Sequence, residues 1–404
     1  MHAVDPTRHR RDARGRRAAR LGPKVAGLAL GLAGLLVPAL PAAAAPVAGA
    51  VQPGPSQVER AEPASDALAG ALAPVLDAGA PGALAGVRVD GALDRAAAGV
   101  ANVDTSRPAH PGDRYRIGSN TKTMTAVVVL QLVEEGRLSL DDPLVDHLPR
   151  FDLDPRMTVR HALQQTTGLP TNTGIWNDPD SVAKNRFRAF TPTELVETAL
   201  ANFPEPRPEP GTSWTYSNTN YVLAGLVVES VTGHSLRTEL RHRVFSPLGL
   251  RHTSFPSRFD PLLSGPALHG YVPGGNGTFE DMTTYNPSWA WAAGAVISTT
   301  SDETMFMRGL FDGTLLSEKS LEVMTDVGEF GYGLALLPIA APCLPGGVAW
   351  GHDGIVFGYT SMAAGAPDGS RQAAVAANLS ADEGDRVYPA LAGALTDVIC
   401  ATDF

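Results

Sequence analysis

Four consecutive residues, Ser119-Asn120-Thr121-Lys122, place a hydroxyl nucleophile three positions before an amine that can take its proton. The residues that follow predict a helix over 123–136, with an apolar side formed by Met124, Val127, Val128, Leu130 and Val133. Side chains three positions apart are neighbours on a helix, so Ser119 would lie under the Lys122 amine. The amino-terminal end of a helix also favours developing negative charge. This arrangement predicts acyl transfer to a serine.

The spacing alone does not identify the site, because Ser181 and Lys184 repeat it. Two more motifs follow in order: Tyr216-Ser217-Asn218, and His352-Asp353-Gly354 at the end of a predicted strand. Taken singly, Tyr216 and Asn218 could be a turn before a helix cap, and His352 a satisfied core histidine. Taken together, Ser-x-x-Lys, Tyr-x-Asn and His-x-Gly in this order favour one catalytic site.

The elements that must position these motifs fall into three blocks. An amphipathic helix is predicted over 66–78, with Pro74 as a kink or early stop. The segment 119–255 is mainly helical, and its clearest helix, 221–232, stops at Gly233. Strands are predicted near both ends, before a closing helix over 388–399: 83–89, 96–103, 332–337, 348–352, 359–364 and 372–378. This order predicts an α+β fold, with an antiparallel sheet built from both chain ends, flanking helices and a mainly helical inserted subdomain.

The domain boundaries follow from composition. Residues 66–404 form the predicted catalytic domain, in which 66–130 and 285–404 make the sheet region and 131–284 the mainly helical region. Residues 51–65 are a flexible lead-in, and 1–50 have the basic, apolar and alanine-rich parts of a signal peptide. An uncleaved anchor is the alternative, but the apolar run is short and Pro38 interrupts it. We therefore expect a secreted, extracellular protein without stable membrane insertion; Sec and twin-arginine export both stay open.

Charge and cysteine content exclude several classes of partner. The chain has 32 basic and 42 acidic residues, and the first 24 residues hold eight of the basic and two of the acidic ones, so the remainder carries a formal charge of −16. This negative charge argues against nucleic acid and anionic membranes as partners and favours small neutral or zwitterionic substrates. Two cysteines and ten scattered histidines form no metal-binding pattern, and no cofactor motif is present. We expect side chains alone to carry the chemistry.

Several longer segments carry a resemblance to a known family. They are VEEGRLSLDDPLVDHLP at 133–149, MTVRHALQQTTGLP at 157–170, PGTSWTYSNTNYVL at 210–223, VFSPLGLRHTSF at 244–255 and AAGAVIS at 292–298. With the three motifs, they resemble the penicillin-recognising serine hydrolases, which include class C β-lactamases and DD-peptidases. The chain looks closest to the secreted actinomycete D-alanyl-D-alanine carboxypeptidases, which also have a late cysteine pair like Cys343 and Cys400.

The resemblance implies a role for each matched residue. Ser119 would be the acylated nucleophile, and Lys122 would either take its proton or hold Tyr216 in a reactive state. Asn218 would orient the substrate amide and Lys122, and His352 would complete the hydrogen-bond network around Tyr216. The backbone N–H groups of Ser119 and Ile355 would form the oxyanion hole.

The resemblance also implies the walls of the site and the covalent state. Trp289 and Trp176 would line the cleft, although Trp289 could equally be a packing residue. Gly354 would let a substrate approach the backbone closely. Cys343 and Cys400 would form a disulfide, as suits an oxidising compartment. The expected enzyme is a monomer that needs no cofactor and no metal.

The sequence departs from those carboxypeptidases where they bind the substrate carboxylate. Asp353 and Ile355 flank Gly354, and residues 332–342 contain no basic side chain. A carboxylate near Asp353 would be repelled. We therefore predict a DD-peptidase-like hydrolase with an altered carboxylate pocket, weak on acyl-D-Ala-D-Ala and better on an ester, an amide or a peptide with an amine near Asp353.

Other functions stay open within and beyond this family. An esterase, a β-lactamase, a D-amino-acid amidase or aminopeptidase, and a non-catalytic relative that only binds peptidoglycan-like or β-lactam ligands share the same motifs. An α/β-hydrolase is disfavoured, because no G-x-S-x-G sequence occurs in the chain.

Overall fold

A computed structural model of the chain describes residues 66–172, 179–203, 207–274, 277–380 and 386–401. All described residues lie within one compact unit, Arg60–Phe404. The predicted signal peptide, the lead-in and Trp176 therefore lie outside the described residues. Within the described part, no helix is both long and apolar enough to cross a membrane.

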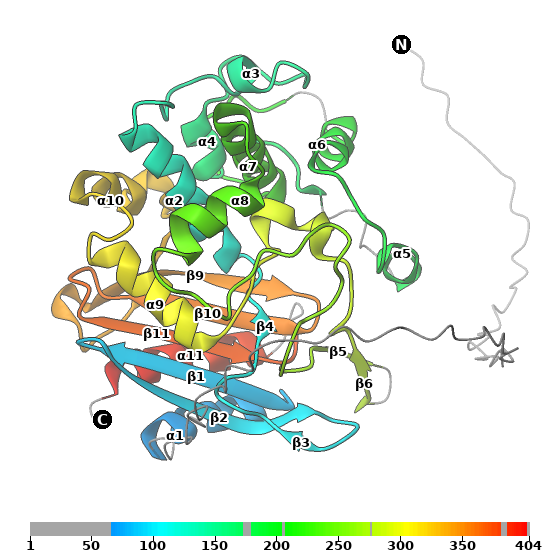
Figure 1. Cartoon of the computed structure of the whole chain (residues 1–404), viewed down its shortest axis with the longest axis vertical. Helices are drawn as coiled ribbons and strands as arrows, with labels where there is room; N and C mark the ends of the chain where they lie inside the picture. Colours follow the sequence, from blue (N-terminus) through cyan, green and yellow to red (C-terminus); the bar gives the residue numbers. More distant parts are fainter. Residues whose placement is uncertain (1–65, 173–178, 204–206, 275–276, 381–385, 402–404) are drawn as a thin grey trace, which may run out of the picture. The chain divides into compact units, whose positions relative to one another are not determined.

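A seven-stranded antiparallel sheet joins the two ends of the chain, in the order β3-β2-β1-β11-β10-β9-β8 (Figure 1). Its centre is the pairing of β1 with β11, in which Ala83 lies opposite Ala377. The strands are β1 Gly82–Val89, β2 Ala92–Asn102, β3 Arg107–Pro108, β8 Leu337–Ala340, β9 Val348–Val356, β10 Tyr359–Gly365 and β11 Arg371–Ala377. Two small sheets pair β4 Tyr115–Arg116 with β7 Ile297–Ser298, and β5 Tyr271–Pro273 with β6 Phe279–Asp281. The predicted fold class is thereby confirmed.

Helices cover both faces of the main sheet. α1 and α11 pack on one face, and α2 and α9 on the other, with α7 against α2 (Figure 1). Successive side chains of a strand point to opposite faces, so Leu84 of β1 enters the core beneath α2 while Ala83 and Ala85 enter the core beneath α1 and α11.

The helical elements have the following bounds. The α-helices are α1 Asp66–Asp77, α2 Asn120–Glu134, α3 Leu144–His147, α4 Val159–Leu163, α5 Pro179–Asn185, α6 Pro192–Ala201, α7 Asn218–Thr232, α8 Leu236–Leu240, α9 Thr300–Phe311, α10 Glu318–Thr325 and α11 Val387–Cys400. A π-helix, η2 Arg241–Phe245, continues α8. The 3-10 turns are η4 Pro287–Trp289, η5 Trp291–Ala293, η6 Gly328–Phe330 and η7 Pro345–Gly347.

One local prediction is wrong, and one of the two alternatives at Pro74 does not occur. The strand expected over 332–337 is absent; β8 begins only at Leu337, because Leu334 N–H bonds to the Met324 carbonyl and Ala335 adopts a φ of +64° that interrupts an extended run. The early stop at Pro74 is also absent. The Pro74 carbonyl accepts the Ala78 N–H, so the last helical turn forms beyond the proline.

Glu303, a carboxyl group buried on α9, gives a testable prediction about stability. Burial, the largest influence, raises the pKa of Glu303 from 4.5 to about 8, and Asp302 adds to this, although the Tyr115 hydrogen bond opposes it. Between these two values the folded state holds a proton that the unfolded state releases, so the free energy of unfolding falls as pH rises. Glu303→Gln should remove this loss, worth on the order of 3 kcal/mol between pH 4.5 and pH 8.

Urea unfolding of both proteins at the two pH values measures this effect. Any fixed packing cost of the amide appears at both pH values, so only the difference between them tests the idea. The exposed Glu322→Gln on α10 is the control and should show no such change. A difference between Glu303→Gln and wild type that is the same at both pH values would contradict the proposed titration.

Candidate active site

Ser119 lies at the start of α2, in a loop that the sheet holds in place. Gly118 has a φ of +55°, which favours glycine, and a Cβ there would lie 3.0 Å from Ile355 N. Asn120 Nδ2 donates to the Ile117 carbonyl (3.1 Å) and to Ser361 Oγ on β10 (3.0 Å). The serine is thus set by contacts from both ends of the chain.

Lys122 is completely buried beneath Ser119. Its Nζ lies within hydrogen-bond distance of Ser119 Oγ (2.9 Å), Asn218 Oδ1 (2.7 Å) and the Ala293 carbonyl (2.9 Å). Burial lowers the pKa of Lys122 to about 7, against a smaller raising effect of Asp353. An ammonium would use all three protons in these contacts, whereas a neutral amine has a lone pair free for the serine proton. The geometry therefore suits proton exchange with Ser119 near neutral pH.

The other Ser-x-x-Lys pair shows no such environment. Ser181 and Lys184 lie on the short helix α5, and Lys184 is exposed to solvent. The same spacing therefore gives a buried amine in one place and a solvated one in the other.

Tyr216 and Asn218 reach the site from the start of α7. The Tyr216 ring centroid lies 4.8 Å from Lys122 Nζ. Desolvation of its hydroxyl, the largest influence, raises the pKa of Tyr216 above 10 although 37% of the residue is exposed, and a hydrogen bond with Ser119 offsets part of this rise. Gln165 supports the segment, because its Oε1 accepts Ser217 N–H (3.0 Å) and Asn220 Nδ2–H (2.7 Å). We did not single out Gln165 from the sequence.

His352 occupies β9 as expected, but its hydrogen-bond partner is not Tyr216. Its Nε2 lies 3.0 Å from the Tyr332 hydroxyl, and its Nδ1 lies 2.6 Å from the Asp353 carbonyl and 3.3 Å from Asp353 Oδ1. Those two oxygens can only accept, so Nδ1 carries a proton. The His352 and Tyr216 rings are neighbours with centroids 6.3 Å apart. His352 therefore lies beside Tyr216, and its Nε2 pairs with the Tyr332 hydroxyl.

Asp353 is held by two hydrogen bonds, from His352 and from the Tyr388 hydroxyl on α11 (2.9 Å to Oδ2). Burial alone would raise the pKa of Asp353, but the hydrogen bond and charge of His352 and the bond from Tyr388 outweigh it and lower the pKa to about 2. Its side chain remains 28% exposed. Asp353 thus presents a fixed negative charge at neutral pH.

A cavity of about 350 Å³ opens beside Ser119. Its walls are formed by Ser119, Trp214, Tyr216, Asn218, Tyr332, Leu337, Asp353 and Ile355. Trp214, Tyr332 and Leu337 were not predicted to line it. Trp214 stands two residues before Tyr216, so its position beside the motif was the available signal.

Two predicted wall residues have other roles. Trp289 is 6% exposed and packs in the core, with its ring 5.8 Å from that of Phe357. The packing alternative therefore describes it better than cleft lining. Gly354 is buried and is not among the residues that line this cavity; a Cβ there would lie 2.0 Å from the Ile117 carbonyl, so glycine lets the loop before Ser119 approach β9 closely.

The contact between Gly354 and the loop before Ser119 also brings together the two residues of the expected oxyanion hole, Ser119 and Ile355. Ser119 and Ile355 both line the cavity, and Ile355 N lies against Gly118. The first N–H groups of a helix lack intrahelical acceptors, and Ser119 caps α2. Ser119 and Ile355 thus lie at the same cavity, as an oxyanion hole formed by their N–H groups would require.

The Cys343–Cys400 disulfide is present, with a Cα–Cα distance of 5.5 Å. It joins the end of α11, the helix that carries Tyr388, to the loop after β8. Among the described residues, no group of three or more His, Cys, Asp or Glu side chains could hold a metal ion.

Known proteins resemble this chain in sequence and fold. The protein family described as Beta-lactamase matches residues 57–397. A D-stereospecific amidohydrolase from Streptomyces sp. aligns with a TM-score of 0.71 and 36% identity, over 80% of this chain and 97% of that one. The D-amino acid amidase from Ochrobactrum anthropi SV3, complexed with L-phenylalanine amide, aligns with a TM-score of 0.71 and 26% identity, over 82% of this chain and 97% of that one.

A curated relative matches over a shorter segment. Protein flp from Staphylococcus aureus (strain NCTC 8325 / PS 47) is 33% identical over 185 residues, which are 43% of this chain and 35% of the relative. The match thus spans about a third of that relative's length.

Proposed function

The chain belongs to the β-lactamase family of serine hydrolases, and from this membership we propose that it cleaves amide or ester bonds through an acyl-enzyme on Ser119. The three-way contact of Lys122 with Ser119, Asn218 and the Ala293 carbonyl supports this role. The N–H groups of Ser119 and Ile355 would stabilise the tetrahedral oxyanion.

In the proposed reaction, the Lys122 amine twice accepts a proton and gives it up again. The Ser119 proton passes to neutral Lys122 as Oγ bonds to the substrate carbonyl carbon. The carbon–nitrogen or carbon–oxygen bond then breaks, and the leaving group takes that proton. A water molecule next gives its proton to Lys122 and attacks the acyl carbon, and Ser119 Oγ leaves with a proton from Lys122.

Lys122 is the better candidate for the base at neutral pH. Its pKa near 7 leaves a large neutral fraction, whereas the raised pKa of Tyr216 keeps that phenol protonated. Tyr216 then serves to hold the Ser119 hydroxyl and to cover Lys122 with its ring. We assign Tyr216 a positioning role for this reason.

The substrate class follows from the charge of the cavity. Asp353 is the one charged side chain on its described walls, and its low pKa keeps it anionic. We infer a substrate with an ammonium group close to the scissile carbonyl, such as an amino-acid or peptide amide. The similarity to a D-stereospecific amidohydrolase and to a D-amino acid amidase supports this choice and suggests a D-configured residue.

A D-alanyl-D-alanine carboxypeptidase activity fits the cavity less well. Such a substrate brings a free carboxylate on the leaving side, and the described walls offer it the carboxylate of Asp353 and no cation. Like charges at short range cost affinity. An esterase or β-lactamase activity places no charge there and remains compatible with the same nucleophile.

The test of the proposed substrate is Asp353→Asn. We expect kcat/KM for a D-amino-acid amide with a free amine to fall about 20-fold, because a hydrogen bond to a charged group contributes roughly 1.5–3 kcal/mol. The N-acetylated amide should show no fall, since it has no ammonium. Steady-state hydrolysis of both substrates measures the effect, and an equal fall for both would rule out ammonium recognition.

Two comparisons complete that experiment. Tyr388→Phe keeps the charge of Asp353 but removes one of its hydrogen bonds, so it should raise KM for the free-amine substrate with a smaller change in kcat. A peptide ending in D-Ala-D-Ala should be cleaved more slowly than its carboxyl-terminal amide. A strong preference for the free acid would show that the carboxypeptidase reading is the better one.

A non-catalytic ligand-binding protein is the alternative from another class. A fluorophosphonate or fluorescent penicillin should label the wild type and not Ser119→Ala. Mass spectrometry over time then reports whether the adduct is released. No adduct with either reagent would favour a binding role.

We also propose that the enzyme acts outside the cell. The basic and apolar start of the chain supports export, and the Cys343–Cys400 disulfide suits an oxidising compartment.

A further inference from the structure

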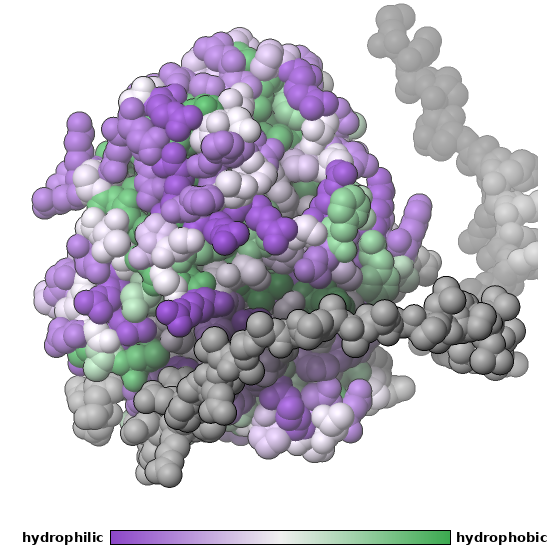
Figure 2. Space-filling view, in the orientation of Figure 1, coloured by the Kyte–Doolittle hydropathy of each residue, from purple (hydrophilic) through white to green (hydrophobic). Residues whose placement is uncertain are grey.

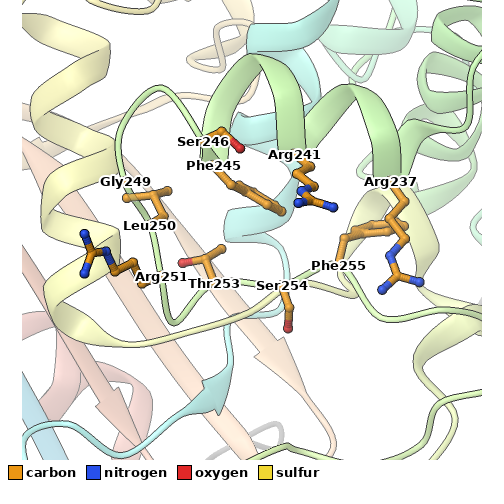
Figure 3. Close-up of a pocket in the computed structure, with 10 residues that line it drawn as sticks. All are labelled: Arg237, Arg241, Phe245, Ser246, Gly249, Leu250, Arg251, Thr253, Ser254 and Phe255. Atoms are coloured by element: carbon orange, nitrogen blue, oxygen red, sulfur yellow. The ribbon is translucent and has the colours of Figure 1, made fainter. Parts of the chain in front are cut away.

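A second cavity, of about 410 Å³, lies beside the helix formed by α8 and η2. We name it the arginine groove and define it by Arg237, Arg241, Phe245, Ser246, Ser254 and Phe255. None of these residues lines the cavity at Ser119. Figure 3 shows Arg237 and Arg241 projecting from the helix toward the same side as the Phe245 and Phe255 rings, whereas Arg251 points away from them.

Helix geometry places the key side chains on one face. Arg237 and Arg241 are four residues apart, and such neighbours on an α-helix lie about 5–6 Å from one another at Cβ. The backbone changes to a π-helix at Arg241–Phe245, with Ser246 N–H bonded to the Arg241 carbonyl (2.8 Å). π-helical turns are rare and occur frequently at functional sites.

The groove lies in a segment whose charge is opposite to that of the chain. Residues 237–258 contain five arginines and one acidic residue, Glu239, in a chain of formal charge −10. Glu239 is already engaged by Arg243 and His234, and Arg243 also pairs with Glu135. Arg237 and Arg241 form no ion pair with any residue that the structure describes. The groove therefore has two guanidinium groups available for an external anion.

The rest of the arginine groove has an apolar floor and a polar rim. Phe245 and Phe255 are 7% and 4% exposed, so their rings form the floor. Ser246 and Ser254 are exposed and offer hydroxyl groups at the rim. In Figure 2, hydrophilic side chains gather over α8, with apolar surface below them. A ligand would meet cations and hydroxyls at one end and aromatic rings at the other.

We propose that the arginine groove binds a small organic anion, with a phosphate or carboxylate bridged by Arg237 and Arg241 and an apolar part against Phe245 and Phe255. Guanidinium groups bind both head groups through paired hydrogen bonds. Two like charges at i and i+4 repel each other on a helix, so an anion between them also relieves this repulsion. This site is separate from the proposed hydrolysis and does not depend on it.

Calorimetric titration with four probes tests the groove: phenyl phosphate, phenylacetate, inorganic phosphate and benzyl alcohol. The protein is the full mature chain carrying Ser119→Ala, so that turnover does not interfere. We expect saturable binding of at least one aryl anion, about threefold or more tighter than inorganic phosphate, and none of benzyl alcohol. The tighter of the two aryl anions identifies the head group.

The variant Arg237→Gln/Arg241→Gln should weaken that binding at least tenfold. Arg150→Gln, which changes an exposed arginine stacked on Phe151 away from the groove, is the matched control and should bind as the parent does. All affected side chains are exposed, so thermal melting should confirm that the variants fold. Absence of saturable binding, or equal weakening in Arg150→Gln, would overturn the proposal.

Discussion

Lys122→Met should lower kcat/KM about a thousandfold, because general-base catalysis contributes 10²- to 10⁴-fold and methionine offers no amine to take the Ser119 proton. In the wild type, kcat/KM should rise about tenfold per pH unit below pH 7 and level off above it. The sign follows from the pKa of Lys122, which burial lowers to about 7, since only the deprotonated amine can act as a base. The residual rate of the variant should lack this inflection.

The shape of the pH profile separates catalysis from structural damage. Methionine leaves Asn218 Oδ1 and the Ala293 carbonyl without the Lys122 donor, so some loss of stability is expected whatever the role of the amine. Tyr216→Phe is the matched comparison: it removes a hydroxyl beside Ser119 but should retain the inflection near pH 7. If Tyr216→Phe removes the inflection and Lys122→Met retains it, the phenol is the base.

Gly354→Ala should reduce kcat at least a hundredfold through geometry alone. The added Cβ would lie 2.0 Å from the Ile117 carbonyl and 2.9 Å from Ser361 Oγ, and the first of these neighbours is backbone that cannot rotate away. β9 or the loop before Ser119 must move, which separates Ile355 N–H from the nucleophile. A displacement of about 1 Å at a reacting centre can cost about 10²-fold in rate.

Gly393→Ala is the control for this substitution. Gly393 lies on α11 with nothing within 4 Å of an added Cβ, and alanine is favoured over glycine in a helix. We expect unchanged kcat and an equal or higher melting temperature. Gly354→Ala with wild-type kcat would mean that the β9 contact does not set the nucleophile.

The sequence predicted the architecture correctly where a hydrophobic pattern could be buried by only one type of element, helix or strand. The predicted strands over 359–364 and 372–378 and the glycine stop at Gly233 correspond to β10, β11 and the end of α7. The strand predicted over 332–337 was wrong, because Tyr332, Leu334 and Leu336 are buried as the apolar pattern requires but do not form a strand. A hydrophobic pattern indicates which residues are buried, but the backbone hydrogen-bond partners decide whether those residues form a strand.

The active site was likewise predicted only in part. Ser119, Lys122 and Asn218 meet because two helix starts converge, and their short motifs carried that information. The contact of Tyr388 with Asp353 could not be read from the sequence, because it joins α11 to β9 across 35 residues without a motif. The same holds for Tyr332 and His352, whose pairing depends on the path of the chain between α10 and β8. Trp289 was misassigned because an aromatic residue near a site can equally be packing.

The pairing of β1 with β11 has a consequence for biosynthesis. Ala83 leaves the ribosome well before its partner Ala377, which lies 294 residues later in the chain. A sheet closed by such distant segments has a high contact order and folds slowly. A chain cut short before β11 has neither a closed sheet nor the support that holds β9 against the nucleophile. Hydrolytic competence thus has to wait until β11 has been made, and chains that end before β11 are expected to be inactive.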